Sequence, residues 1–445
     1  MPYGPTPDTP IDTSTETSTD TPPDTSTAST SAAPPRIVPP SRRPRVAPNR
    51  TQGRPARAAR ALRHASPALL AYAAVRLFGV LVFALWARTE HRGVWHLLAE
   101  SWDCDWYLRI ADKGYADTLG TQIDANNLAF FPLHPLLIRA GSVIVPEPRG
   151  AVGLAVAVGC SFLAAWGIFA VGDHLHGRRT GVLLAALWGS LPVALVQWMG
   201  YTESLFTALT AWALYAVLTG RWIWAGSLAA LAGLTRPTGV ALAAAVSLTA
   251  LLTLFRQRRR KGSEGYRDFK GYEGHGEGRF PVRTLLGTLL APLGWLSYVA
   301  WVGLRLDRWD GYFAVQKLWH NEWDGGVSTL RTMYDLLAVQ RPQLFLTMVT
   351  ATLLASLALF VLSVGDRQPL PLLVFTGLLL LIVLGSKGVY FPRARFLLPG
   401  FPLLLPLAAA LARARTQVAV TVMVAAAVTS AAFGGHMLLA WMGPP

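Results

Sequence analysis

The sequence predicts an all-α, polytopic membrane protein. Of its 445 residues, 52% are hydrophobic and only 15% are charged, whereas a soluble domain carries roughly 25% charged residues. Apolar runs of about 17–25 residues recur along the chain, and such runs are long enough to cross a hydrocarbon core about 30 Å thick. The mean hydropathy of +0.36 agrees with a membrane protein. These observations exclude a soluble globular protein.

Residues 1–66 are predicted to form a disordered cytoplasmic tail that becomes basic towards its end. The first 35 residues are mostly Thr, Ser, Pro, Asp and Ala, a composition that cannot bury a hydrophobic core. No signal peptide fits, because the first apolar segment begins only near Ala68. We therefore expect residues 67–445 to form the membrane domain of a multi-pass cell-membrane protein whose N-terminus is cytoplasmic.

About eleven transmembrane helices are expected, and they can be oriented because Arg and Lys beside apolar spans favour the cytoplasm. The segment 128–145 contains two prolines and Arg139, so we interpret it as a juxtamembrane or re-entrant helix in the first extracytoplasmic loop. The Gly- and Arg-rich loop 256–283 is expected to be cytoplasmic and flexible. The expected spans are 68–87, 151–171, 180–199, 205–218, 222–234, 240–255, 285–304, 344–364, 370–384, 396–411 and 418–441.

The net charge of +15 does not indicate a nucleic-acid partner. The basic residues concentrate in the stretches 36–63 and 256–261, and both directly adjoin apolar spans. The preference of basic residues for the cytoplasmic side explains this distribution, and no nucleic-acid recognition motif accompanies it. Membrane lipids are therefore the expected partners of these charges.

Four segments on the predicted extracytoplasmic side collect polar residues. Acids come from the N-terminal segments and bases from the C-terminal one. A carboxylate can act as general base toward a hydroxyl, and cations can stabilise a phosphate that leaves. The segments therefore predict transfer from a lipid phosphate. They are 101–127 with Asp103 and Asp105, 201–203 with Glu203, 305–343 with Asp307, Asp310, Gln316 and His320, and 386–395 with Lys387, Tyr390, Arg393 and Arg395.

Three sequence blocks carry a family resemblance. The first is Trp102-Asp103-Cys104-Asp105-Trp106-Tyr107, followed by Phe130-Phe131-Pro132-Leu133-His134-Pro135; the second is Tyr201-Thr202-Glu203-Ser204-Leu205-Phe206; the third is Arg393-Ala394-Arg395-Phe396-Leu397-Leu398-Pro399. In order and spacing the blocks resemble the PIG-V type mannosyltransferases of the GT-C superfamily, including actinobacterial members.

The resemblance implies a polyprenyl-phosphate-mannose donor, inversion at the anomeric carbon and an extracytoplasmic active site. It assigns the role of base to Asp103 and matches Asp105 to the second acid of a D-x-D/E pattern. Eukaryotic members act on a glycolipid-anchor intermediate that a bacterium would not make, and the tail and basic loop of this chain look bacterial. The acceptor expected here is therefore a lipid- or glycan-linked one whose identity stays open.

The candidate site combines catalytic and substrate-binding residues without a metal or other cofactor, since no zinc-binding motif occurs and a donor with one phosphate has less need of a cation. Structural alternatives stay open for several candidates. Both acids of the first block could cap the helix expected near Trp106, and His134 could be structural. Tyr107 could be an interfacial anchor of the aromatic belt, and Glu203 could simply begin a span. Arg393 and Arg395 could be the solvated flank of a span. The catalytic candidates are Asp103 and Asp105, and the substrate-binding candidates are Glu203, Arg236, Lys387, Arg393, Arg395, Tyr107 and His134.

Two other functions compete with a glycosyltransferase. A multi-pass transporter or lipid flippase would place ionisable residues and broken helices near the membrane midplane. The break at Arg236-Pro237 favours this alternative, whereas the clustering of ionisable residues on one face does not. A non-catalytic assembly partner that kept the scaffold is the third possibility, and loss of the acid–base layout would indicate it.

Overall fold

The computed structural model describes residues 54–120, 126–145, 148–263, 280–339, 341, 343–441 and 443–445. The chain divides into two units between Gly53 and Arg54, and all described residues belong to the second unit. Residues 1–53 of the predicted tail and residues 264–279 of the predicted cytoplasmic loop lie outside the described residues.

Helices make up nearly all regular structure of the described residues, where a single isolated β-bridge joins Trp323 and Ser386. In chain order the helices are α1 (Arg54–Thr89), α2 (Val94–Ala99), α3 (Asp103–Lys113), η2 (Asn127–Ala129), α4 (Leu133–Gly141), α5 (Arg149–His176), α6 (Arg178–Gly189), η3 (Ala194–Trp198), α7 (Glu203–Leu218), α8 (Trp222–Gly233), α9 (Gly239–Ser263), α10 (Phe280–Leu290), α11 (Leu293–Arg305), α12 (Gly311–Leu318), α13 (Val327–Tyr334), η4 (Asp335–Val339), α14 (Leu344–Gly365), α15 (Leu370–Gly385), α16 (Arg393–Phe396), η5 (Phe401–Leu404), α17 (Leu405–Arg413) and α18 (Thr416–Leu439).

The all-α, multi-span fold class is confirmed, but the number of eleven spans is not. Among the described residues, six stretches of helix are long and apolar enough to cross a membrane. The predicted span 180–199 is not one helix, because α6 ends at Gly189 and η3 follows after a turn. The six stretches are Ala59–Thr89, Arg149–His176, Gly239–Arg256, Val282–Arg305, Leu344–Gly365 and Thr416–Leu439, and shorter apolar helices cover Glu203–Leu218, Trp222–Gly233, Leu370–Gly385 and Phe401–Arg413.

Two predicted boundaries lie elsewhere in the structure. Helix α1 begins at Arg54, so the residues directly before Ala68 are helical and not part of a disordered tail. Ala and Arg make up most of residues 54–63, and both are strong helix formers, which extends the helix beyond the apolar span. Helix α9 continues to Ser263 and α10 begins at Phe280, so the predicted loop 256–283 is helical at both ends.

Helix α4 is the short helix expected within residues 128–145. Its nine residues measure about 14 Å, less than half the hydrocarbon thickness. It contacts α3 and α5, and the Leu133 amide donates to the Leu234 carbonyl over 2.9 Å. This contact joins the first sequence block to the end of α8, two residues before Arg236.

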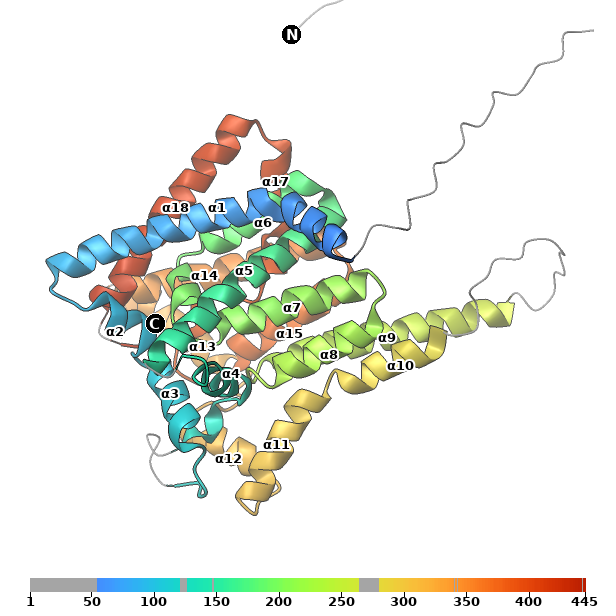
Figure 1. Cartoon of the computed structure of the whole chain (residues 1–445), viewed down its shortest axis with the longest axis horizontal. Helices are drawn as coiled ribbons and strands as arrows, with labels where there is room; N and C mark the ends of the chain where they lie inside the picture. Colours follow the sequence, from blue (N-terminus) through green and yellow to red (C-terminus); the bar gives the residue numbers. More distant parts are fainter. Residues whose placement is uncertain are drawn as a thin grey trace, which may run out of the picture. The chain divides into compact units, whose positions relative to one another are not determined.

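The long helices bring the site-bearing segments together at one end. Helices α5, α7 and α8 run side by side, with α2, α3 and α4 at one end of them (Figure 1). Glycines let neighbouring backbones approach closely, since a Cβ on Gly226 of α8 would collide with the backbone of Gly287 in α10. Separately, the Thr202 hydroxyl contacts Tyr107 of α3 and Arg236, which places the start of α7 and the connection between α8 and α9 next to α3.

Candidate active site

Asp103 stands at the first position of α3, directly after a strained residue. Trp102 precedes the helix with φ 53° and ψ −116°, a combination that is rare for a residue with a side chain. The helix has no side-chain cap, so the capping role considered for Asp103 and Asp105 is absent there. The backbone turn at Trp102 instead frees the Asp103 carboxylate for tertiary contacts.

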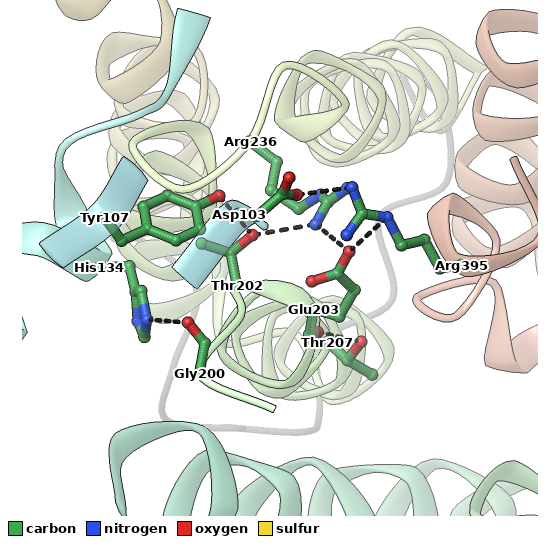
Figure 2. A network of polar contacts seen from close by, with 9 residues as sticks. All are labelled: Asp103, Tyr107, His134, Gly200, Thr202, Glu203, Thr207, Arg236 and Arg395. Carbon is green, nitrogen blue, oxygen red and sulfur yellow. Dashed lines mark hydrogen bonds and ion pairs between the residues drawn. The ribbon is translucent and has the colours of Figure 1, made fainter. Parts of the chain in front are cut away.

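Four charged side chains from four separate segments form one cluster, here called the charge quartet: Asp103, Glu203, Arg236 and Arg395 (Figure 2). The Nη2 atom of Arg395 donates to Oδ2 of Asp103 over 2.5 Å. Oε1 of Glu203 lies 2.7 Å from Nη1 of Arg236 and 3.7 Å from Nε of Arg395. One oxygen of Glu203 therefore contacts both guanidinium groups, and two negative charges balance two positive ones.

Burial explains why these charges pair, because an unpaired charge inside a protein is very costly. Glu203, Arg395 and Arg236 are 1%, 5% and 8% exposed, whereas the Asp103 side chain is 24% exposed. Burial alone would lower the pKa of Arg395, but Asp103 and Glu203 outweigh it and raise that pKa above its ordinary value. Arg395 is therefore a permanent cation, and Asp103 is the accessible carboxylate of the quartet.

Aromatic rings flank both guanidinium groups. The Cζ atom of Arg395 lies 4.8 Å from the ring centre of Tyr201 and 5.3 Å from that of Phe396. The Phe396 ring also lies 5.2 Å from Cζ of Arg236. Cation–π contacts of this kind are favourable when water is excluded. The rings therefore fix the direction in which the two arginines present their donors.

Thr202 connects the quartet to the first sequence block. Its hydroxyl accepts from Nη1 of Arg236 over 2.9 Å and lies 3.2 Å from the Tyr107 hydroxyl. Burial raises the pKa of Tyr107 above its ordinary value, so this phenol keeps its proton. The contacts hold Tyr107 and Arg236 on two sides of the turn that leads into Glu203 (Figure 2).

His134 supports this turn from behind. Its Nε2 atom lies 3.1 Å from the Gly200 carbonyl oxygen, two residues before Thr202, and its ring meets the Tyr107 ring edge-on at 5.0 Å. Burial lowers the pKa of His134 to about 4, so the ring is neutral at physiological pH and donates to the carbonyl. His134 is outside the cavity lining and positions residues that the cavity contacts.

A cavity of about 300 Å³ opens next to the quartet. One part of its wall carries Asp103, Arg236 and Arg395, and another part carries aromatic rings and side-chain amides. Nη1 of Arg395 is buried and has no hydrogen-bond partner among the described residues, so a donor remains available beside the cavity. The lining residues are Asp103, Tyr107, Ala129, Phe130, Phe131, Thr235, Arg236, Pro237, Gln316, Trp319, Asn321, Val389, Phe391, Pro392, Arg395, Phe396 and Pro444.

Five of the predicted site residues are outside the cavity lining. Glu203 belongs to the charge quartet and His134 contacts Tyr107, whereas Asp105, Arg393 and Lys387 make contacts elsewhere. Asp105 pairs with Arg109 over 2.6 Å on the outer face of α3. Arg393 donates to the Ser386 carbonyl over 2.7 Å, and Lys387 is exposed. Helix geometry explains two of these outcomes, since residues two apart point about 200° away from each other. Asp103 and Arg395 face the cavity. Asp105 and Arg393 are each two residues away from one of them on the same helix, so their side chains point away from the cavity.

Some residues of the site are not predicted by the sequence. Trp319 and Asn321 line the cavity and follow α12, in a polar segment with no recognisable motif. Phe396 lines the cavity directly after Arg395, and Thr202 contacts Tyr107 and Arg236 directly before Glu203. Their positions inside the second and third sequence blocks are the only signal for these two residues. Within the described ranges, no three His, Cys, Asp or Glu side chains form a group that could hold a metal ion.

Comparison with known protein sequences shows that part of this chain is distantly related to a mannosyltransferase. Over 149 residues the chain is 31% identical to mouse GPI alpha-1,6-mannosyltransferase 2 (Mus musculus), and the alignment spans 31% of this chain but only 29% of that enzyme. No family model matches the chain. The chain is thus distantly related to a glycosyltransferase over a part of its length.

Among solved structures, ArnT from Cupriavidus metallidurans bound to undecaprenyl phosphate covers 78% of this chain. The match spans 62% of ArnT, with 11% identity and a TM-score of 0.48. The apo oligosaccharyltransferase of Archaeoglobus fulgidus covers 85% of this chain over 56% of its own, with 15% identity and a TM-score of 0.46. The chain therefore spans less than two thirds of the length of each protein.

Proposed function

We propose that this protein is a membrane glycosyltransferase that moves mannose from a polyprenyl-phosphate-mannose donor to a hydroxyl of a lipid- or glycan-linked acceptor. One observation carries the proposal: an accessible carboxylate, Asp103, and a buried cation with an unused donor, Arg395, line the same cavity. A sugar transfer from a lipid phosphate needs a base and an anion-stabilising group within one substrate length of each other.

The reaction follows from these two groups. Asp103 accepts the proton of the acceptor hydroxyl while the hydroxyl oxygen bonds to the anomeric carbon. The bond between that carbon and the phosphate oxygen breaks, and the electron pair leaves with the polyprenyl phosphate. Arg395 and Arg236 face the charge that develops there. One displacement at the anomeric carbon gives inversion.

The ion pair between Asp103 and Arg395 orders this site before substrate arrives. Nη2 of Arg395 is committed to Asp103, whereas Nη1 is free to bind a phosphate oxygen. A guanidinium fork suits such simultaneous contacts, and an ammonium group does not. Arg395 would thereby fix the distance between the base and the leaving phosphate.

The remaining cavity wall suits a sugar ring. Trp319 and Phe130 form an edge-on aromatic pair with ring centres 5.6 Å apart, and aromatic faces pack well against the apolar face of a sugar. Gln316 and Asn321 are hydrogen-bonded to each other over 3.2 Å and present amide donors and acceptors that can bind hydroxyl groups. A mostly apolar cavity with a few placed polar groups is typical of small-molecule sites.

The test is a transfer assay on membranes that contain the protein. Polyprenyl phosphate carrying radiolabelled mannose is supplied, and label is followed into extracted glycolipids and glycans. Membranes with the Asp103→Asn variant at equal protein level serve as the blank. We expect transferred label with the wild type alone. Label that merely crosses the membrane, still attached to its lipid, would contradict the proposal and identify a flippase.

A further inference from the structure

A second cavity lies between α1, α6 and α18, at the end of the molecule opposite the charge quartet. Its volume is about 690 Å³. Helix α6 begins at this end with Arg178 and leads, through η3, to the quartet residue Glu203. We name this cavity the α1–α18 groove. Its lining residues are Pro67, Ala74, Val75, Phe78, Arg178, Arg179, Val182, Leu183, Thr416, Ala419, Val420, Met423, Val424 and Ala427.

The groove opens on the surface that membrane lipid would cover. Helices α1 and α18 are both long and apolar enough to cross a membrane, and they cross each other in Figure 1. Phe78, Val420 and Val424 in the groove are 39%, 55% and 56% exposed. The stretch of α18 that lines it, from Thr416 to Ala427, measures about 16 Å, roughly half the hydrocarbon thickness.

Two arginines stand at the polar end of this apolar surface. Arg178 and Arg179 are both exposed, and each donates one hydrogen bond to a backbone carbonyl. Nε of Arg178 donates to the His64 carbonyl over 3.3 Å, and Nη2 of Arg179 donates to the Ala414 carbonyl over 2.9 Å. The ion pairs of the described residues include neither arginine, and Asp173 pairs with His64 over 2.9 Å. Their other guanidinium donors remain available to an outside anion.

The groove has an apolar lining and, at its polar end, two guanidinium groups with available donors. These two features match the acyl chain and the phosphate headgroup of a phospholipid. A fatty acyl chain fits the apolar lining, and the guanidinium fork binds phosphate oxygens through paired hydrogen bonds. A zwitterionic headgroup would bring its own cation towards the arginines, whereas an anionic headgroup would not. We propose that the α1–α18 groove binds an anionic glycerophospholipid, with its phosphate on Arg178 and Arg179.

The proposal is tested with purified protein that is reconstituted in equal amounts of phosphatidylglycerol and phosphatidylcholine. The lipids retained after transfer to detergent are counted by native mass spectrometry. We expect the wild type to retain phosphatidylglycerol over phosphatidylcholine by about tenfold. The double variant Arg178→Gln/Arg179→Gln should lose this preference. The matched control Arg88→Gln/Arg92→Gln neutralises two exposed arginines at the other end of α1, one in its last turn and one just after it, and should keep this preference.

A second variant tests the contribution of the apolar groove to lipid binding separately from that of the two arginines. Val420→Trp fills exposed space in the groove and leaves both arginines in place, so we expect it to lower retention of phosphatidylglycerol several-fold. Equal retention of the two lipids by the wild type would overturn the proposal. It would also be overturned if the double arginine variant retained phosphatidylglycerol as the wild type does, or if Val420→Trp left retention unchanged.

Discussion

The charge quartet and Arg76 are both buried and charged, but their guanidinium groups have different partners. In the quartet, each guanidinium contacts a carboxylate and a cavity opens beside them. Arg76, in the middle of α1, is 1% exposed and donates over 2.7 Å to the Gly189 carbonyl at the end of α6. No carboxylate of the described residues pairs with it. Its partner is the negative end of a helix dipole.

The difference separates a site from a structural contact. A cluster of two acids and two bases is costly to bury. In the proposed function, the quartet acts through the cavity that Asp103, Arg236 and Arg395 line. Arg76 touches neither cavity and joins α1 to α6. The free energy of unfolding should therefore respond differently to substitution in the two regions, and function should depend on the quartet.

The largest change in stability is expected for Glu203→Gln. This variant leaves the guanidinium groups of Arg236 and Arg395 buried without the carboxylate that contacts both of them. Breaking a buried ion pair from one side costs about 3–5 kcal/mol. Thermal unfolding in detergent measures the loss. Asp105→Asn is the control, since its exposed pair with Arg109 contributes less than about 1 kcal/mol. Equal melting temperatures of the two variants would contradict the role of Glu203.

An intermediate effect on the free energy of unfolding is expected from protonation of His134, a neutral side chain buried beside the quartet. Its pKa is about 4 in the folded chain against an ordinary 6.5, so the unfolded chain binds an extra proton between these values. The stability that depends on neutral His134 is complete above about pH 6.5 and is lost as the pH falls towards about 4, by up to about 3 kcal/mol.

Melting temperatures of the wild type and His134→Gln between pH 4.5 and 7.5 check this expectation. The variant has no imidazole to titrate, so its melting temperature should fall less steeply towards acid pH. If the melting temperatures of the two proteins fell equally with pH, burial of neutral His134 would not be the cause of the pH dependence.

The smallest effect is expected at Arg76. Arg76→Met removes a buried charge together with its hydrogen bond and replaces the side chain with an apolar one of similar length. The two changes oppose each other, so the free energy of unfolding should change by about 1 kcal/mol or less. Transfer activity should stay near that of the wild type. A loss as large as that of Glu203→Gln would show that Arg76 belongs with the quartet.

The sequence predicts the fold class and three of the four segments that carry the quartet, because apolar runs and charge patterns are properties of the chain itself; Arg236 is predicted only as a single candidate residue at a helix break. Asp103, Glu203, Arg236 and Arg395 were all candidates. Their neighbours Asp105 and Arg393 were candidates too, since residue type alone does not say which side of a short helix faces a cavity. That depends on the turn at Trp102 and on the position at which α16 begins.

Other features depend on tertiary contacts that no local pattern records. The segment 180–199 is apolar throughout, yet α6 ends at Gly189, where the carbonyl accepts from Arg76. Trp319 and Asn321 reach the cavity because α12 packs on η2, an approach between segments far apart in the chain. Sequence periodicity reports the buried face of a helix and not the partner that it meets.

The matched pair Asp103→Asn and Asp105→Asn tests the central claim most directly. The two acids belong to one helical turn and the substitutions are chemically identical, but only Asp103 lines the cavity. The rate of mannose transfer from polyprenyl-phosphate mannose is measured for both variants at equal amounts of folded protein. We predict a loss of about 100-fold or more for Asp103→Asn and a change within about twofold for Asp105→Asn. Wild-type transfer by Asp103→Asn, or an equal loss in both variants, would contradict the account.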